Sequence, residues 1–147
     1  MKKLFQSTII SGGTEEQREK ETGNLLGKDF NLLSLGFNFY LIEKEEGEGI
    51  GIEQLRELEK NLSLKSKGDE EKIVFVKNAG EMSLNAQNAF LKTLEEPPLK
   101  TKIILSTDNY GLLLPTIVSR CQLIEIKNNN IFGELEIKEI QKQFWKQ

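Results

Sequence analysis

The run Pro115-Thr-Ile-Val-Ser-Arg-Cys121 contains the residue of this chain best suited to chemistry, Arg120. The arginine follows a short helical or turn segment and precedes a strand, so we expect it to project from the edge of a domain. A guanidinium stays charged and presents a rigid fork of donors, which suits it to bind anionic oxygens. Its neighbours have simpler interpretations: Ser119 is a local cap or turn residue, and Cys121 is a small buried hydrophobe.

A second candidate group follows Gly12-Gly13, at the place where a phosphate-binding loop would follow a first strand. Such a loop needs glycines, so that backbone N–H groups can surround the phosphates, and then Lys and Ser/Thr. In this register Gln17, Arg18 and Glu19 take the places of the last Gly, the Lys and the Ser/Thr. Arg18 keeps a positive charge, but the glutamates around it would repel a polyphosphate. The phosphate-binding motif is therefore degenerate.

The magnesium-binding motif of nucleotide hydrolases is altered as well. That motif normally ends its strand with Asp-Glu, which holds magnesium and positions the attacking water. Here the corresponding strand, 72–76, is followed by Lys77 and Asn78. Because both motifs are altered together, we expect a domain that neither binds nor hydrolyses ATP well and that uses no cofactor or metal.

The elements that position these residues follow from the apolar pattern. Short apolar runs alternate with helical patterns along the chain, which is typical of a parallel α/β sheet. The predicted strands share a short apolar or β-branched sequence: 7–11, 38–43, 72–76, 102–106 and 122–126. The predicted helices share helical spacing or a clear end signal: 14–26, 52–65, 83–96 and the short segment 112–118. Thr14 and Ser83 are suited to cap two of these helices, and Pro97-Pro98 stops the second.

Composition limits the classes of function. The chain has 147 residues, the length of one domain, and its 37% hydrophobic residues are enough for a packed core. A net charge of −3 argues against an electrostatic grip on DNA by the whole domain. A single cysteine excludes an intrachain disulfide and a multi-cysteine zinc site, and the commonest general base, histidine, is absent. No long hydrophobic span follows the first residues, so we expect a cytoplasmic protein without membrane contact.

Residues 72–126 resemble the second half of the AAA+ module of bacterial DNA polymerase III clamp loaders, and residues 7–65 fit its first half in layout. Two motifs at the correct separation carry the resemblance: Leu91-Lys-Thr-Leu-Glu-Glu-Pro-Pro98 and Ser119-Arg120-Cys121. For residues 1–127 it implies a three-layer AAA+ or P-loop NTPase-like α/β domain with a mostly parallel five-stranded sheet. Residues 128–147 are expected to form a linker and a C-terminal helix, a vestige of the family's lid domain, with the collar domain absent.

Degenerate nucleotide motifs together with a retained Ser-Arg-Cys triplet resemble the delta-prime subunit of such loaders. The resemblance implies a non-hydrolysing subunit in a hetero-oligomer, whose Arg120 reaches, as an arginine finger, the ATP of an adjacent motor subunit. The other implied neighbour is the clamp-opening subunit. Lys92 and Lys100 are candidates for weak contact with primer–template DNA, although exposed lysines are ordinary. Ser106-Thr107 lies where the family senses the γ-phosphate, but without a nucleotide we interpret it as strand-end chemistry.

Two alternatives stay open from the residues alone. One is an active AAA+ ATPase with an atypical phosphate loop that uses Arg18, and measurable nucleotide affinity would favour it. The other is a stand-alone protein-interaction module that keeps the fold, and failure to bind any motor subunit would favour that reading. Glu95 and Glu96 could pass for paired catalytic carboxylates, but we interpret them as solvated residues at a helix C-terminus.

Overall fold

A computed structural model describes residues 6–64 and 70–127 of the chain. The five strands share one parallel sheet: β1 (Ser7–Gly12), β2 (Phe39–Ile42), β3 (Lys72–Val76), β4 (Thr101–Thr107) and β5 (Gln122–Ile126). The α-helices pack on its two faces: α1 (Glu15–Leu26), α2 (Phe30–Ser34), α3 (Ile52–Leu64), α4 (Leu84–Glu95) and α5 (Pro115–Val118). Two single turns of 3-10 helix follow β3 and β4: η1 (Ala79–Glu81) and η2 (Tyr110–Leu112).

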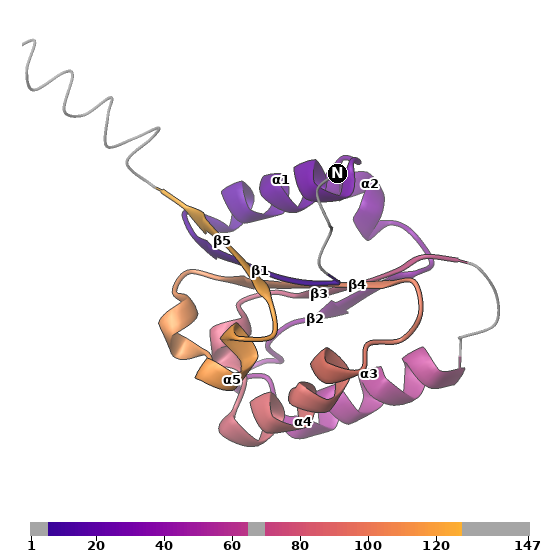
Figure 1. The fold of residues 1–147 in the computed structure, drawn as a ribbon, viewed down its shortest axis with the longest axis vertical. Coiled ribbons are helices and arrows are strands. Elements are labelled where there is room, and N and C mark those ends of the chain that lie inside the picture. The colour runs from indigo at the N-terminus through magenta and orange to yellow at the C-terminus, as the bar shows by residue number, and fades with distance from the viewer. Residues whose placement is uncertain (1–5, 65–69, 128–147) are drawn as a thin grey trace, which may run out of the picture.

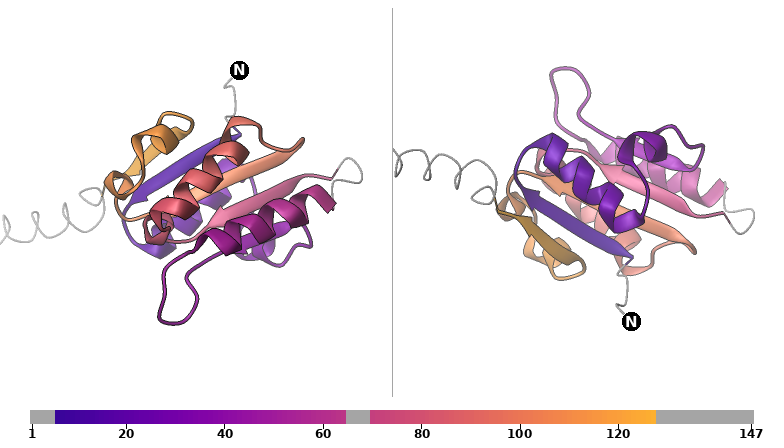
Figure 2. Two further views of the ribbon diagram at one scale, coloured as in Figure 1. Left: turned by 90° about the horizontal axis from the view of Figure 1, so that it is seen from below. Right: turned by 90° about the horizontal axis from the view of Figure 1, so that it is seen from above.

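The domain has three layers, with α1 and α2 on one face of the sheet and α3, α4 and α5 on the other (Figure 1). Two further views show the helices of each layer covering the strands and running roughly along them (Figure 2). The strand order is β2-β3-β4-β1-β5, and every neighbouring pair is parallel. The three-layer α/β fold with a parallel five-stranded sheet, expected from the sequence, is therefore confirmed.

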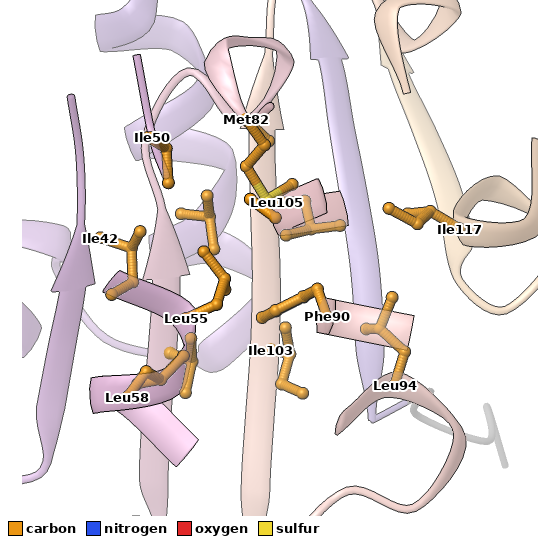
Figure 3. Close-up of a cluster of buried hydrophobic side chains, with 14 of the residues drawn as sticks. Ile42, Ile50, Leu55, Leu58, Met82, Phe90, Leu94, Ile103, Leu105 and Ile117 are labelled. Atoms are coloured by element: carbon orange, nitrogen blue, oxygen red, sulfur yellow. The ribbon is translucent and has the colours of Figure 1, made fainter. Parts of the chain in front are cut away.

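The larger part of the hydrophobic core lies between the sheet and the layer of α3, α4 and α5 (Figure 3). Leu55 and Phe90 from the helices meet Ile103 and Leu105 from β4 there, and all four side chains are buried. A smaller cluster lies under α1 and α2. There the ring of Phe30 packs edge-on against the ring of Phe75, with 4.9 Å between the ring centroids. Because β3 and β4 are covered on both faces, their sequences are apolar without alternation.

The predicted helix signals are present in the structure. The Thr14 side chain accepts a hydrogen bond from the backbone N–H of Gln17 at the start of α1. Ser83 accepts one from the N–H of Ala86 at the start of α4. The short helix α2 was not predicted, because five residues are too few to show a helical period and Leu32 in its centre is exposed.

Two predictions from the sequence concern the C-terminal residues and the membrane. The linker and C-terminal helix predicted over 128–147 lie outside the described residues, so they stay a prediction. Of the helices within the described ranges, none is long and apolar enough to cross a membrane.

Candidate functional site

The two arginines singled out from the sequence lie at opposite edges of the parallel sheet. Arg18 lies near the carboxyl ends of β1, β3 and β4, the edge at which open α/β sheets bind ligands. Arg120 comes two residues before β5 begins, so it lies at the amino-terminal edge. The site residues therefore form two separate groups, which we call the Arg18 centre and the Arg120 edge.

The Arg18 centre is a buried guanidinium surrounded by neutral acceptors. Arg18 is only 2% exposed. Its Nε donates to the hydroxyl of Ser106 at 2.8 Å, and its Nη1 donates to the carbonyls of Gly12 and Gly13, each at 2.9 Å. Its Nη2 donates a longer bond, of 3.4 Å, to the side-chain oxygen of Asn78. One side chain thus joins the ends of three strands, with contacts from β1, β3 and β4.

The segment that would have to form a phosphate loop is wound into the first turn of α1. The helix begins at Glu15, before the residues that align with the end of a phosphate-binding motif. Thr14 and Gln17 form a reciprocal capping box, with the N–H of Thr14 donating to Gln17 at 2.9 Å and the N–H of Gln17 donating to Thr14 at 3.1 Å. Side chains of the protein therefore occupy two backbone donors of a kind that phosphate loops direct at their ligand.

Lys77 and Asn78, at the end of β3, are tied to Glu15 rather than left open for a metal. The Asn78 side chain donates to Glu15 at 2.8 Å, and the Lys77 ammonium lies 3.6 Å from the same carboxylate. The hydrogen bond from Asn78, with the positive charge of Lys77 adding to it, holds the pKa of Glu15 below its ordinary value. Within residues 6–64 and 70–127 there is no cluster of His, Cys, Asp and Glu that could hold a metal ion.

The remaining residues of the degenerate motif have ordinary surroundings. Gln17 is half-buried in the capping box. Glu19, also half-buried, lines a groove along the outer side of α1 together with Glu15 and Lys77. This groove contains both acidic and basic side chains, so its charge does not favour a polyphosphate.

At the Arg120 edge, the guanidinium is partly exposed and held at two points. The side chain of Arg120 keeps 34% of its surface exposed. Its Nη1 donates to the carbonyl of Thr116 in α5 at 2.7 Å, and its Nη2 forms an ion pair with Glu95, at the end of α4, also at 2.7 Å. Within the described part of the chain, Nε makes no hydrogen bond. The hydroxyl of Ser119, the residue that caps α5, donates to the same Thr116 carbonyl at 3.0 Å.

Cys121 is a packing residue, as the sequence suggested. It is partly buried against the larger hydrophobic cluster. Burial raises the pKa of its thiol to about 12, so almost no thiolate is present at neutral pH.

The structure extends three of the expectations from the sequence. Glu95 and Glu96 are exposed at the end of α4, as predicted, but the ion pair between Glu95 and Arg120 was missed. Ser106 lies near the end of the buried strand β4, as predicted, but it also accepts a hydrogen bond from Arg18. Lys92 is exposed and pairs with Glu59 at 3.5 Å, which is ordinary surface chemistry.

The sequence of this chain matches a known protein family and its members. The family model described as DNA polymerase III, delta subunit, matches residues 5–130. The DNA polymerase III subunit delta' of Escherichia coli is 33% identical over 110 residues, which cover 74% of this chain and 33% of the relative. The subunit delta' of Haemophilus influenzae is 33% identical over 99 residues, which cover 66% of this chain and 30% of the relative. The chain thus spans about a third of the length of these relatives.

Solved structures agree with the fold. A DNA polymerase III gamma subunit-related protein of Thermotoga maritima has 30% identity and a TM-score of 0.66, covering 88% of this chain and 43% of that one. The Holliday junction branch migration motor RuvB of the same organism has 10% identity and a TM-score of 0.51, covering 82% of this chain and 37% of that one. At that identity, the second likeness shows a common fold and nothing further.

Proposed function

The chain belongs to the DNA polymerase III delta-subunit family, and on that premise we propose that it is a non-hydrolysing, delta-prime-like subunit of a clamp loader. In this proposal Arg120 acts in trans, as an arginine finger on ATP bound by a neighbouring motor subunit during clamp loading. The hetero-oligomer also contains the clamp-opening subunit, and the protein works in the cytoplasm. Weak contact with DNA through Lys92 or Lys100 is a secondary part of the proposal.

The observation that carries this proposal is the partly exposed guanidinium of Arg120 at the edge of the domain. An arginine side chain has five N–H donors, and here the two described contacts engage only Nη1 and Nη2, one each. Among the residues that the structure describes, the Nε–H and the second hydrogen on each Nη have no acceptor and could donate to oxygens of a phosphate. Such a finger contributes roughly 10³–10⁵ to the rate of phosphoryl transfer, because it offsets charge that develops in the transition state.

The buried Arg18 centre supports the non-hydrolysing half of the proposal. A phosphate group could enter this place only if the guanidinium gave up its contacts with Ser106 and the two glycine carbonyls. Glu15, the carboxylate in contact with the end of β3, is already paired with Lys77 and Asn78. The alternative of an active ATPase that uses Arg18 requires this whole network to rearrange.

The test is ATP hydrolysis by a reconstituted loader of cognate motor subunits, clamp-opening subunit, clamp and primed DNA. The full chain is added as wild type, as Arg120→Ala, or as Arg56→Ala. Arg56 is a matched control, since it is also a surface arginine paired with a glutamate, Glu53, at 3.0 Å. We expect stimulation by wild type and Arg56→Ala, and loss of hydrolysis at the neighbouring site with Arg120→Ala while assembly is unchanged. Equal stimulation by all three forms would reject the finger assignment.

Nucleotide affinity separates the proposal from an active ATPase. A ligand at 100 times its Kd stabilises a protein by about 2.7 kcal/mol, which would raise the melting temperature by several degrees. We expect millimolar Mg-ATP to leave the melting temperature of the isolated chain unchanged. A clear increase would favour the active ATPase, whereas failure to bind any motor subunit would favour a stand-alone interaction module.

A further inference from the structure

Glu95 is the acidic partner of Arg120, the proposed finger. It lies in the run Leu91–Pro98, at the end of α4. Its Oε1 lies 2.7 Å from Nη2 of Arg120. The carboxylate keeps 49% of its side-chain surface exposed and the arginine 34%, so both groups are at the surface and in contact with water. The ion pair connects the end of α4 with the residue that follows the C-terminal cap of α5.

The two helix ends that carry the ion pair are rigidly anchored. Leu94, the residue before Glu95, and Ile117 in α5 both belong to the larger hydrophobic cluster and are labelled in Figure 3. The N–H of Glu96 still donates to the carbonyl of Lys92, so the last turn of α4 stays closed. Packing therefore fixes the backbone positions from which the two side chains of the ion pair extend.

The contacts of the guanidinium fix its plane without blocking it. Nη2 is held by Glu95, and Nη1 is held by the Thr116 carbonyl. Two contacts on different nitrogens define the orientation of a planar group, and neither of them uses Nε. A free arginine in the same place would sample many rotamers, and each productive encounter would have to select one of them.

We propose that Glu95 is a positioning residue for Arg120, which holds the guanidinium in the orientation needed for the phosphate of the neighbouring subunit. This inference rests on the proposed function. An ion pair in water is too weak to keep Arg120 away from a highly charged phosphate, but it is strong enough to bias a rotamer. Glu95 therefore acts as an aid to the finger and not as an autoinhibitory latch.

The chain supplies a matched control in Glu96. It is the next residue, is also exposed, carries the same charge, and makes no ion pair with Arg120. Glu96→Gln removes the same charge from the same surface, so it reports any general electrostatic effect on the neighbouring ATP. The difference between Glu95→Gln and Glu96→Gln isolates the contact with the guanidinium.

The experiment measures kcat and KM for ATP in the reconstituted loader with the full chain as Glu95→Gln, Glu96→Gln, Arg120→Ala, and Glu95→Gln combined with Arg120→Ala. We expect Glu95→Gln to lower kcat roughly two- to fivefold, the range that a rotamer bias from an exposed ion pair allows, with KM unchanged. Glu96→Gln should match wild type. The double variant should match Arg120→Ala alone, because Glu95 acts only through the arginine.

Three outcomes would overturn the inference. Equal rates for Glu95→Gln and Glu96→Gln would show that the contact has no role, and a higher rate for Glu95→Gln would mean a latch. A further loss in the Arg120→Ala background would place the action of Glu95 outside the arginine. If Arg120→Ala itself changes nothing, the proposed function fails. If Arg120→Ala lowers the rate and Glu95→Gln does not, only the positioning role fails.

Discussion

Arg18 and Arg120 carry the same guanidinium, but the fold gives them opposite surroundings. Arg18 is 2% exposed, and its described hydrogen bonds all go to neutral acceptors: two carbonyls, a hydroxyl and an amide oxygen. Arg120 has a third of its side chain in water, and its acceptors are a carboxylate and one carbonyl. The donors of Arg18 point to acceptors inside the domain and connect the strand ends. The guanidinium of Arg120 lies at the surface, where a ligand could reach it. The two arginines therefore differ in burial and in the acceptors that they contact, and not in charge.

The Arg18 centre also shows how a side chain of the protein itself connects the carboxyl ends of the strands. At the carboxyl edge of the sheet, a bound phosphate would otherwise offer contacts to the end of β1 and to the strands beside it. Arg18 reaches the ends of β1, β3 and β4 from within the chain. Hydrogen bonds from Arg18 therefore hold the carboxyl ends of these strands together, and they require no ligand.

The largest expected effect on stability is that of Arg18→Ala. This change removes the donor to the part-buried Gly12 and Gly13 carbonyls and to the buried Ser106 hydroxyl. Leaving a buried polar acceptor without its partner costs about 1–3 kcal/mol, and here several acceptors lose their donor at once. Urea unfolding of the full chain should therefore show a large fall in the midpoint concentration.

Lys20→Ala is the control for Arg18→Ala, because Lys20 is a cation on the same helix but is exposed. We expect its free energy of unfolding to lie within about 0.5 kcal/mol of the wild-type value. If Arg18→Ala were no less stable than Lys20→Ala, the view that the Arg18 centre holds the strand ends together would be wrong.

A smaller effect is expected for the stability of Arg120→Ala. The side chain is partly exposed and its ion pair with Glu95 is in water, so the change should cost less than about 1 kcal/mol. The same unfolding assay, extended to Glu95→Gln and the double variant, should give a coupling energy of about 0.2–1 kcal/mol. A loss as large as that of Arg18→Ala would mean that Arg120 is a structural residue, and the contrast would disappear.

The smallest effect is the pH dependence of Glu15. Its folded pKa lies below the value of 4.5 taken for the free side chain, so it stabilises the fold above about pH 4.5, and this contribution is lost as pH falls through the lowered folded pKa. Glu15→Gln should therefore lower the unfolding free energy at pH 7 by well under about 1 kcal/mol, and the difference should shrink as the pH falls below 4.5.

Glu16 serves as the control for Glu15, because it is an exposed acid in the same turn of α1. It makes no ion pair with Lys77, whose described partner is Glu15. A difference between Glu15→Gln and wild type that persists unchanged at pH 3 would contradict the assigned contacts. An equal pH dependence for Glu16→Gln would assign the effect to the helix terminus instead.

Local signals in the sequence were sufficient for most of the fold. Thr14 and Ser83 cap the helices that they were expected to cap, and the apolar runs form the predicted strands. The inward orientation of Arg18 was missed because its partners, Ser106 and Asn78, are far away along the chain. One signal was available: Arg18 and Thr22 are four residues apart, so they share the face of α1 that is buried.

The contact between Glu95 and Arg120 was missed for a related reason. Each residue was singled out within its own motif, but their proximity depends on tertiary packing of α4 against α5. Topology offered a clue, since each residue lies at the end of a helical segment that returns to the amino-terminal edge of a parallel sheet. The distance and partner atoms, by contrast, depend on core packing around Leu94 and Ile117, which no local pattern encodes.

The measurement that tests the division of roles most directly is the pre-steady-state burst of phosphate release from the fully assembled loader. The burst amplitude counts ATP hydrolysed per complex, so it resolves the loss of a single site even if other sites continue to turn over. With Arg120→Ala, we predict that assembly is complete and that the amplitude falls by the one site next to this chain. An unchanged burst from a fully assembled Arg120→Ala complex would contradict the account.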